Sequence, residues 1–311
     1  MDIFTKISEY TGNGRPVLTV GMFDGVHTGH KAILEKVVQS AGQLGCPSLV
    51  VTFHPHPRLV LGKDAEVKLL HTYEERVEHF RLAGIDQLLI IPFTLEFAAL
   101  SAEEFIQNVL VEKLNMRIII TGHDHSFGKG AGGNFKLLKR LGKINDFTVE
   151  KLQALMLKGE PVSSSLIRRE LEKGEVKHAN KLLGYPYPIS GNVVRGNQIG
   201  KLIGFPTANI HLEDPHKLIP DRGVYSSLVS WNEKTYKGMS NIGIRPTING
   251  HELTVEVNIF DFDTDIYFEN LTLHLIDRIR DEKKFGNLDL LKNQLFLDRK
   301  HAECTLASWE L

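Results

Sequence analysis

Short apolar runs alternate with helix-like segments along the first half of the chain. Residues 17–23, VLTVGMF, predict a buried strand, and residues 29–44 carry apolar side chains at the spacing of one helix face. The same alternation predicts three more strands and three more helices, at residues 46–53, 72–84, 86–93, 101–114, 116–122 and 134–144. The 101–114 helix opens with the capping-box spacing of Ser101 and Glu104. Strands that alternate with helices predict a parallel sheet covered on both faces.

The pattern changes near residues 182–191, LLGYPYPISG, which follow a helical stretch at residues 163–183. Beyond this point four short apolar runs are separated by Gly, Pro, Asn and Asp turns, at residues 223–231, 235–243, 253–260 and 271–279. This spacing predicts a small antiparallel barrel or sandwich, and residues 287–303 predict a last helix. We therefore expect two domains, residues 1–184 and residues 185–311.

Composition agrees with a globular protein of two domains. The chain has 311 residues, 42% hydrophobic and 24% charged, and globular domains hold roughly 100–200 residues each. The formal net charge of -1 argues against a protein that coats nucleic acid or an anionic membrane. Cys46 and Cys304 have no CxxC spacing, which favours a reducing cytoplasm. No apolar run approaches the roughly 18 residues of a membrane-spanning helix. The oligomeric state is left open.

Three polar loops follow predicted strands of the first half: residues 21–30 (GMFDGVHTGH), 52–57 (TFHPHP) and 121–133 (TGHDHSFGKGAGG). Ligands of parallel sheets bind at the carboxyl ends of the strands. Because all three loops fall there, together they predict a binding site at this edge.

His27 and His30 allow three interpretations. The glycines around them let the backbone approach a ligand closely, and the helix that follows points free N–H groups and its positive end into the loop, which favours an anion. Zinc binding would need further ligands, which His54, His56, His123 or His125 would supply, but HExxH and CxxC spacings are absent from the sequence. A turn with two solvated histidines is the third interpretation.

Two glycine patterns resemble nucleotide-binding motifs without matching them. Gly128, Gly130 and Gly133 fit GxGxxG but do not directly follow a strand. Residues 196–201 resemble a P-loop, yet the spacing is GxxxGK and the next residue is Leu202. These glycines still let backbone amides face phosphate.

Residues 204–209, GFPTAN, contain two oxygen donors suited to Mg²⁺, the hydroxyl of Thr207 and the amide carbonyl of Asn209. Their spacing of two places both side chains on one face of an extended segment. In the run LTVEVNIF, Glu256 and Asn258 share one strand face, and Val255 and Val257 share the other.

Eight segments together resemble the bacterial bifunctional riboflavin kinase/FAD synthetases. In the first half these are GMFDGVHTGH, TFHPHP, GHDHSFGKGAGGN and VSSSLIRREL, and in the second half GFPTAN with its preceding glycines, NIGIRPTING, VEVNIFDFDTDIY and IRDEKKF. The resemblance implies an α/β plus all-β fold: a Rossmann-like nucleotidylyltransferase domain with a parallel sheet, then a riboflavin kinase-like antiparallel β-barrel with a terminal helix.

By this resemblance the first domain adenylylates FMN with ATP to give FAD and pyrophosphate, without a covalent enzyme intermediate. His27, His30 and Arg168 are then the expected catalytic residues. The expected ATP and phosphate contacts in this half are Gly21, Phe23, Asp24, Gly29 and Ser164. The expected flavin contacts are His56, Asp124, Phe127 and Gly128.

The second domain is implied to phosphorylate riboflavin with ATP, giving FMN and ADP. Glu256 is then the base that accepts the proton of the riboflavin 5′-hydroxyl, and Thr207 and Asn209 hold Mg²⁺. The expected ATP and phosphate contacts in this half are Gly196, Gly200, Lys201 and Gly204. Arg280 is expected to contact flavin or nucleotide phosphate.

Four positions depart from the family pattern. Lys201 replaces the usual Arg, Asn258 the usual His, Phe268 the usual Gly and His125 the usual Phe. These departures leave two rivals to the bifunctional enzyme: a flavin-binding regulatory or storage protein, and an enzyme with one activity only. The expected partners are riboflavin, FMN and ATP, with no nucleic acid and no membrane.

Overall fold

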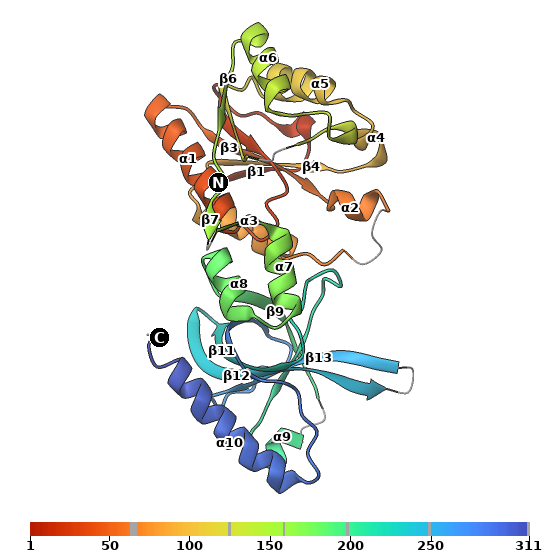
Figure 1. The fold of residues 1–311 in the computed structure, drawn as a ribbon, viewed down its shortest axis with the longest axis vertical. Helices are drawn as coiled ribbons and strands as arrows, with labels where there is room; N and C mark the ends of the chain where they lie inside the picture. Colours follow the sequence, from red (N-terminus) through yellow and green to blue (C-terminus); the bar gives the residue numbers. More distant parts are fainter. Residues whose placement is uncertain (63–66, 124–125, 158, 197–198, 248–249, 310–311) are drawn as a thin grey trace. The chain divides into compact units, whose positions relative to one another are not determined.

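The computed structural model describes residues 1–62, 67–123, 126–157, 159–196, 199–247 and 250–309. The chain separates into two compact units, Met1–Ser164 and Ser165–Leu311, which are described one at a time (Figure 1).

The first unit is built on a six-stranded sheet in which every pair of neighbours is parallel. The strand order is β1-β4-β3-β2-β5-β6. The strands are β1 (Asp2–Phe4), β2 (Val17–Val20), β3 (Ser48–His54), β4 (Gln87–Pro92), β5 (Ile118–Thr121) and β6 (Thr148–Lys151). The short pair β7 (Met156–Leu157) and β8 (Glu160–Pro161) forms a separate antiparallel ribbon. The predicted parallel sheet is confirmed.

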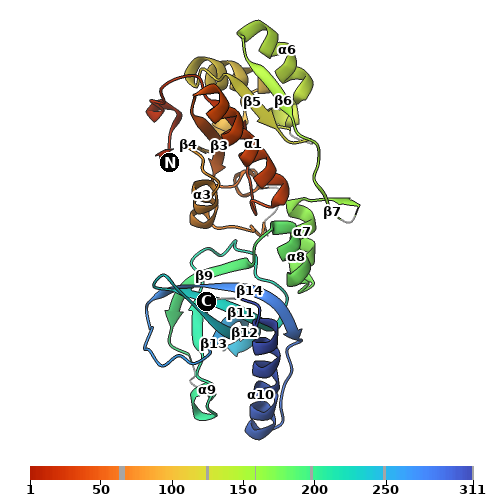
Figure 2. The ribbon, with the colours of Figure 1, turned by 90° about the vertical axis from the view of Figure 1, so that its left-hand side faces the viewer.

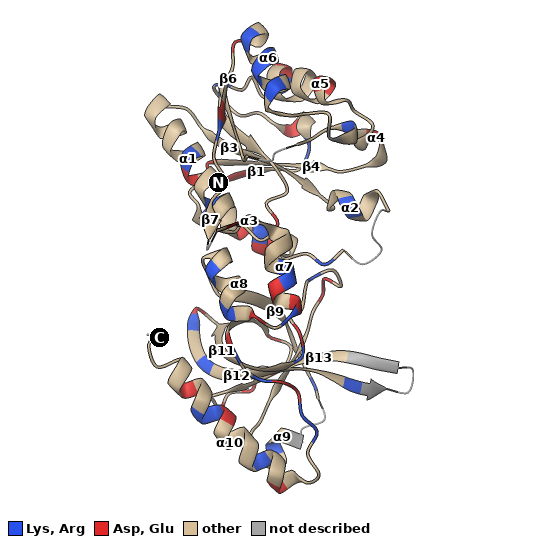
Figure 3. Cartoon of the chain, viewed as in Figure 1, with Lys and Arg blue, Asp and Glu red and all other residues tan. Residues whose placement is uncertain are grey.

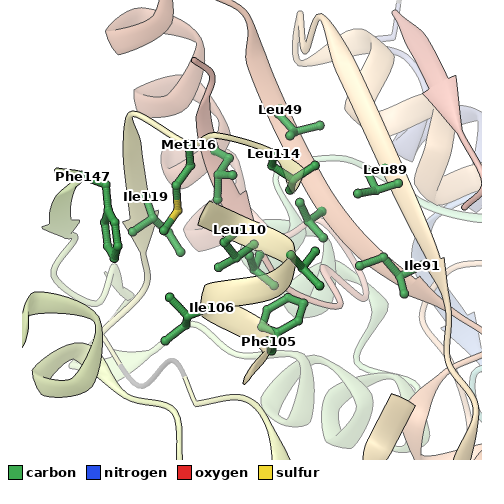
Figure 4. Packing of buried hydrophobic residues seen from close by; sticks show 14 of the residues in the cluster. Leu49, Leu89, Ile91, Phe105, Ile106, Leu110, Leu114, Met116, Ile119 and Phe147 are labelled. Carbon is green, nitrogen blue, oxygen red and sulfur yellow. The ribbon is translucent and has the colours of Figure 1, made fainter. Parts of the chain in front are cut away.

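Successive residues of the central strands enter two different cores, as the period of two along a strand requires. Val17, Val50 and Leu88 face the core that α1 and α3 cover, whereas Leu18 and Leu49 face the opposite core. Figure 4 shows this second core, where side chains of the helix at 105–113 point toward strand residues. Burial on both faces explains why these strands are continuous apolar runs in the sequence.

The helices of the first unit begin where side chains satisfy their terminal N–H groups. Ser101 and Glu104 form the predicted capping box, and Thr72 and Glu75 form a second one. The helices are α1 (Thr28–Leu44), α2 (Pro57–Val60), α3 (Tyr73–Leu82), α4 (Leu95–Ala98), α5 (Ala102–Glu104) and α6 (Phe135–Asn145), with 3-10 turns η1 (Ile7–Glu9) and η3 (Lys129–Ala131). The segment predicted as one helix at 101–114 continues from α5 as a π-helix, η2 (Phe105–Lys113).

The helix α7 (Ser164–Glu172) begins at the last residue of the first unit, and α8 (Val176–Leu183) follows it in the second unit. The sequence predicted one helical stretch here, and Gly174, with φ +77°, separates the two helices. A closed antiparallel barrel follows, in the order β10-β13-β12-β11-β14-β9. Its strands are β9 (Tyr187–Val194), β10 (Ala208–His211), β11 (Gly223–Trp231), β12 (Lys234–Thr247), β13 (Gly250–Ile259) and β14 (Asn270–Arg280), with α9 (Ile199–Leu202) between β9 and β10.

The terminal helix α10 (Leu288–Thr305) packs along the outside of the barrel, as Figure 2 shows. Asn287 caps it by accepting from the N–H of Leu290. Of the two architectures left open by the pattern, the barrel is the one that forms. No helix among the described residues is long and apolar enough to cross a bilayer.

Candidate active sites

The loop after β2 ends in a pair of stacked histidines at the N-terminus of α1. His27 is the N-cap of this helix, and its Nδ1 accepts from the backbone N–H of His30 at 3.2 Å. The two rings stack with their centroids 3.6 Å apart. Because Nδ1 of His27 is an acceptor, the proton of the neutral ring lies on Nε2. The loop therefore joins imidazole groups to the positive end of a helix dipole.

Burial, and then the electrostatic influence of the neighbouring His27, hold the pKa of His30 well below its ordinary value. Nδ1 of His30 is buried and has no hydrogen-bond partner among the described residues. The edge of the Phe23 ring packs against the imidazole, with centroids 5.1 Å apart. The glycines fit closely here: a Cβ on Gly29 would lie 3.3 Å from the His27 ring, and one on Gly21 would lie 3.0 Å from the Phe23 ring. His30 is therefore a neutral ring held in a fixed orientation.

Asp24 is buried and orders the loop through its carboxylate. Its oxygens accept from the backbone N–H groups of Leu70 at 3.0 and 3.2 Å and of His71 at 3.1 Å. The backbone carbonyl of Asp24 accepts from the hydroxyl of Ser164 at 2.7 Å. Asp24 and Ser164, two of the predicted phosphate contacts, are thus hydrogen-bonded to each other. Asp24 is bonded in addition to the backbone that precedes α3.

Arg76, which the sequence did not single out, ties two of the rim loops together. Its Nη1 donates to the carbonyl of Met22 at 3.0 Å and its Nη2 to the carbonyl of Phe53 at 3.1 Å. The side chain is buried, and burial lowers its pKa while the nearby charge of Asp24 raises it. Every residue has a backbone carbonyl, so the partners of Arg76 leave no recognisable motif in the sequence.

A cavity of about 580 Å³ opens at the carboxyl ends of β2, β3 and β4. Five phenylalanine rings line it, from Phe53, Phe93, Phe97, Phe105 and Phe127. These rings pack edge to face at centroid distances of 5.8–5.9 Å in the pairs Phe53–Phe93, Phe93–Phe97, Phe97–Phe105 and Phe105–Phe127. Such a wall suits a flat aromatic ligand.

The loop at residues 127–133, which we call the glycine loop, forms one wall of this cavity. Phe127 and Gly133 exchange backbone hydrogen bonds at 3.2 and 2.8 Å. A Cβ on Gly133 would lie only 2.6 Å from the Phe127 ring. Gly128, with φ +73°, has room for no side chain, because its Cβ would lie 2.8 Å from the backbone of Ala102. Phe127 and Gly128, both predicted flavin contacts, line the cavity together with Lys129.

The remaining predicted residues of the first domain lie as follows. His56 is the N-cap of α2, where its Nδ1 accepts from the N–H of Arg58 at 3.2 Å. Arg168 is half-buried on α7, in the second unit. Asp124 and His125 lie outside the described residues.

Positive charge gathers on α6, which begins directly after the glycine loop (Figure 3). The helix carries four exposed cations, Lys136, Lys139, Arg140 and Lys143. Glu103 pairs with Arg140. A row of cations of this kind raises the local concentration of anionic ligands.

In the second unit, the barrel brings Thr207 and Asn209 of the GFPTAN segment together with Glu256. Asn209 of β10 pairs with Glu256 of β13 in the sheet register. The hydroxyl of Thr207 donates to Oε2 of Glu256 at 3.3 Å. Nη2 of Arg245 donates to Oε1 of Glu256 at 3.1 Å and to Oδ1 of Asn209 at 3.3 Å. Arg245 lies in the segment NIGIRPTING, one of the segments that resemble the family, and the sequence pattern predicts no role for it.

The glycines before GFPTAN pack directly on this cluster. A Cβ on Gly196 would lie 2.2 Å from the Asn209 amide, and one on Gly200 would lie 2.2 Å from the Phe205 carbonyl. Gly204 takes a left-handed φ of +85° that favours glycine. Lys201 is exposed on α9. Backbone at Gly196 therefore lies closer to the Asn209 amide than any side chain would permit.

Two of the departures from the family pattern acquire a structural context. Asn258 is buried, and its Nδ2 donates to the carbonyl of Pro206 at 2.7 Å, which fixes the residue before Thr207. Phe268 takes a left-handed φ of +68° and is 75% exposed. A glycine there would avoid the strain.

Arg280, the predicted flavin or phosphate contact, is engaged within the protein. Its Nε and Nη2 donate to the buried carboxylate of Asp298 on α10, at 2.7 to 3.0 Å. Its Nη1 donates to the carbonyl of Asp281 at 2.9 Å. The structure gives this arginine the task of joining β14 to α10.

The donor sets differ in the cations they suit. Among the described residues, no group of three or more His, Cys, Asp or Glu side chains is placed to hold a metal. Thr207, Asn209 and Glu256 instead offer hydroxyl, amide and carboxylate oxygens around a guanidinium, which is a cation. Hard oxygen donors of this kind suit Mg²⁺, so these residues fit that metal.

The first unit combines a parallel sheet, a helix N-terminus that favours anions, and an aromatic cavity. The second unit is a barrel that holds a cluster of oxygen donors. Together these features define a class of two-part enzymes that act on phosphorylated aromatic molecules. The family model for FAD synthetase matches residues 11–166, and the model for riboflavin kinase matches residues 183–306. The chain belongs to the family of bifunctional riboflavin kinase/FMN adenylyltransferases.

Relatives cover nearly the whole chain. The bifunctional riboflavin kinase/FMN adenylyltransferase of Escherichia coli K12 is 36% identical over 283 residues, 91% of this chain and 90% of the relative. That of Listeria monocytogenes is 37% identical over 298 residues, 94% of this chain and 93% of the relative. A crystal structure of a macrolide-efflux protein from Streptococcus pneumoniae matches with a TM-score of 0.89 and 32% identity, covering 99% of each chain. The resemblance found in the sequence motifs is confirmed.

Proposed function

We propose that this chain makes both flavin cofactors, phosphorylating riboflavin in residues 185–311 and adenylylating FMN in residues 1–184. The observation that carries the proposal is the cluster of Thr207, Asn209 and Glu256, in which a carboxylate, a hydroxyl and an amide meet beside backbone that only glycine allows. Family membership points to the same pair of reactions.

In the kinase reaction, Glu256 accepts the proton of the riboflavin 5′-hydroxyl as its oxygen attacks the γ-phosphorus of ATP, and ADP leaves. Asn209 and Thr207 would hold Mg²⁺, which when bound neutralises charge on the phosphates. Backbone at Gly196, Gly200 and Gly204 lets amides face the phosphates, and Lys201 supplies a cation nearby. Arg280 serves this site indirectly, by fixing α10.

In the adenylyltransferase reaction, a phosphate oxygen of FMN attacks the α-phosphorus of ATP in line, and pyrophosphate leaves. His27 donates from Nε2 to the ATP phosphates, and His30 contributes a second imidazole. The N-terminus of α1 at Gly29 adds backbone N–H groups, and Arg168 stabilises the developing charge. Alignment of the two substrates supplies about 7–11 kcal/mol of such a barrier.

The aromatic cavity takes the flavin ring, with Phe127 and Gly128 on the wall formed by the glycine loop. His56 and Asp124 are the further flavin contacts of this proposal. Gly21, Phe23, Asp24 and Ser164 shape the phosphate loop, which supports its role in holding ATP. Both cysteines are free thiols, which agrees with a reducing cytoplasm as the place of action.

The test incubates the purified chain with riboflavin, ATP and Mg²⁺ and separates the flavins by chromatography. We expect FMN to form first and FAD to follow. Riboflavin that stays bound but unconverted would contradict the proposal and indicate a storage or regulatory protein. FMN without FAD would leave the kinase alone.

A further inference from the structure

Arg245 lies between the two side chains that the proposed kinase reaction needs for metal and proton. One guanidinium nitrogen, Nη2, is 3.3 Å from Oδ1 of Asn209 and 3.1 Å from Oε1 of Glu256. The other carboxylate oxygen accepts from Thr207. The positive charge therefore rests among the oxygens that would surround a metal ion.

The register of β12 and β13 explains how Arg245 reaches this position. Asn241 pairs with Glu256, so Asn241, Gly243 and Arg245 alternate onto the face that carries the carboxylate. Gly243 has no side chain between them, and a Cβ there would lie 3.1 Å from the Asn241 amide and 2.5 Å from Oε1 of Glu282. The arginine side chain extends back past this gap.

The positive charge of Arg245 opposes the binding of a metal cation to the same oxygens. Among Thr207, Asn209 and Glu256, only the carboxylate carries charge, and the guanidinium neutralises it. A dication brought to the same oxygens would meet a like charge a few ångströms away. The ion pair is partly exposed, with side-chain exposures of 31% and 25%, and pairs of this kind are weak. The contact is therefore weak enough to exchange, while Arg245 and Thr207 each hold one carboxylate oxygen of Glu256.

We propose that Arg245 competes with Mg²⁺ for the oxygens of Asn209 and Glu256, and that the phosphates of the incoming nucleotide draw its guanidinium away. Arg245 is then a positioning residue that couples metal binding to nucleotide binding. It keeps the bare metal from the site and holds Glu256 in place beforehand. This inference rests on the kinase function proposed above.

The test measures binding of Mn²⁺ alone to the full-length chain, from the loss of the free-ion electron paramagnetic resonance signal. In the Arg245→Met variant the competing charge is gone, and we expect Mn²⁺ to bind at least about fivefold more tightly than in the wild type. The double variant Arg245→Met/Asn209→Ala should lose this gain, because it lacks an amide oxygen of the site. Equal or weaker Mn²⁺ binding by Arg245→Met would overturn the proposal.

Two controls separate charge from folding. Arg245→Lys keeps the charge, so its Mn²⁺ affinity should stay near that of the wild type; a gain as large as that of the methionine variant would overturn the proposal. Arg299→Met removes an equally exposed arginine that pairs with Glu303 on α10 and should change nothing. Should Arg245→Met fail to fold, Arg245→Gln serves the same measurement.

The kinase assay keeps this inference distinct from the function on which it rests. We expect Arg245→Met to reach half-maximal FMN formation at a lower Mg²⁺ concentration than the wild type. A wild-type chain that forms no FMN would refute the proposed function, whereas unchanged Mn²⁺ affinity in an active enzyme would refute only the role of Arg245.

Discussion

The guanidinium of Arg280 grips the carboxylate of Asp298 with Nε 3.0 Å from both oxygens and Nη2 2.7 Å from one of them. Asp298 is 1% exposed, and Gln294 also donates to it at 2.9 Å. Since Arg280 is the last residue of β14 and Asp298 lies within α10, this pair fastens the terminal helix to the barrel.

We predict that Arg280→Met lowers the free energy of unfolding of the second unit by about 3 kcal/mol, because it leaves a buried carboxylate without its counter-charge. Both tryptophans, Trp231 and Trp309, lie in this unit, so tryptophan fluorescence during urea unfolding reports on it alone. Arg299→Met breaks two exposed or partly exposed ion pairs, with Glu303 and Asp261, and should cost about 1 kcal/mol or less. Equal losses in the two variants would argue against the pair as a fastening.

Glu256→Gln should abolish FMN formation, since an amide cannot accept the hydroxyl proton, and general-base catalysis contributes about 10²–10⁴ in rate. FAD formation from supplied FMN should continue unchanged, because Glu256 lies in the barrel. Chromatography of both reactions on one preparation provides the internal control. FMN formation near the wild-type rate would show that Glu256 is not the base.

Much of the fold follows from local patterns. Val17 and Leu18 enter opposite cores, so an apolar run without alternation correctly predicted a strand buried on both faces. Ser101 and Glu104 carry their own start signal. The sequence did not decide between barrel and sandwich, because closure depends on β9 pairing with both β10 and β14. That strand contains Pro188 and Gly191, which conceal its pattern.

The sites were predictable where chemistry is local and not where it depends on distant partners. The spacing of Thr207 and Asn209 is local, whereas their meeting with Glu256 depends on the pairing of β10 with β13. Arg76 donates to carbonyls of two separate loops, and backbone carbonyls leave no trace in the sequence. The ligand contact of Arg280 stays a prediction, and no motif indicates its carboxylate partner Asp298, which lies 18 residues further along the chain. The catalytic and binding roles themselves remain predictions.

Gly128→Ala should raise the KM for FMN in FAD formation by about tenfold while changing kcat less. Gly128 has φ 73° and ψ 176°, a region open essentially to glycine alone, and the added Cβ would meet the backbone of Ala102 at 2.8 Å. The loop must shift, and Phe127 moves with it. About 1.4 kcal/mol of lost contact corresponds to this tenfold change.

Gly159→Ala is the matched control, because Gly159 also has a left-handed φ, +86°, but nothing lies within 4 Å of its added Cβ. It should cost stability without changing the KM for FMN. If both variants shifted this KM alike, the glycine loop would not form the flavin wall.

The stability of the first unit should fall as the pH drops below about 6.5, because burial, and then the electrostatic influence of His27, lower the pKa of His30. Below that pH the unfolded chain binds a proton that the folded ring refuses, so stability falls by up to about 1.4 kcal/mol per pH unit until the folded pKa is reached. Calorimetry of the full-length chain between pH 7.5 and 5.5 measures this slope.

His30→Gln removes the ring and should flatten this slope, whereas His301→Gln, at an exposed position of α10, should leave it unchanged. His274 in the barrel is shifted in the same direction by burial, so the comparison is between variants and not between units. If the slope of His30→Gln is as steep as that of the wild type, the His30 ring is not the group whose lowered pKa makes stability depend on pH.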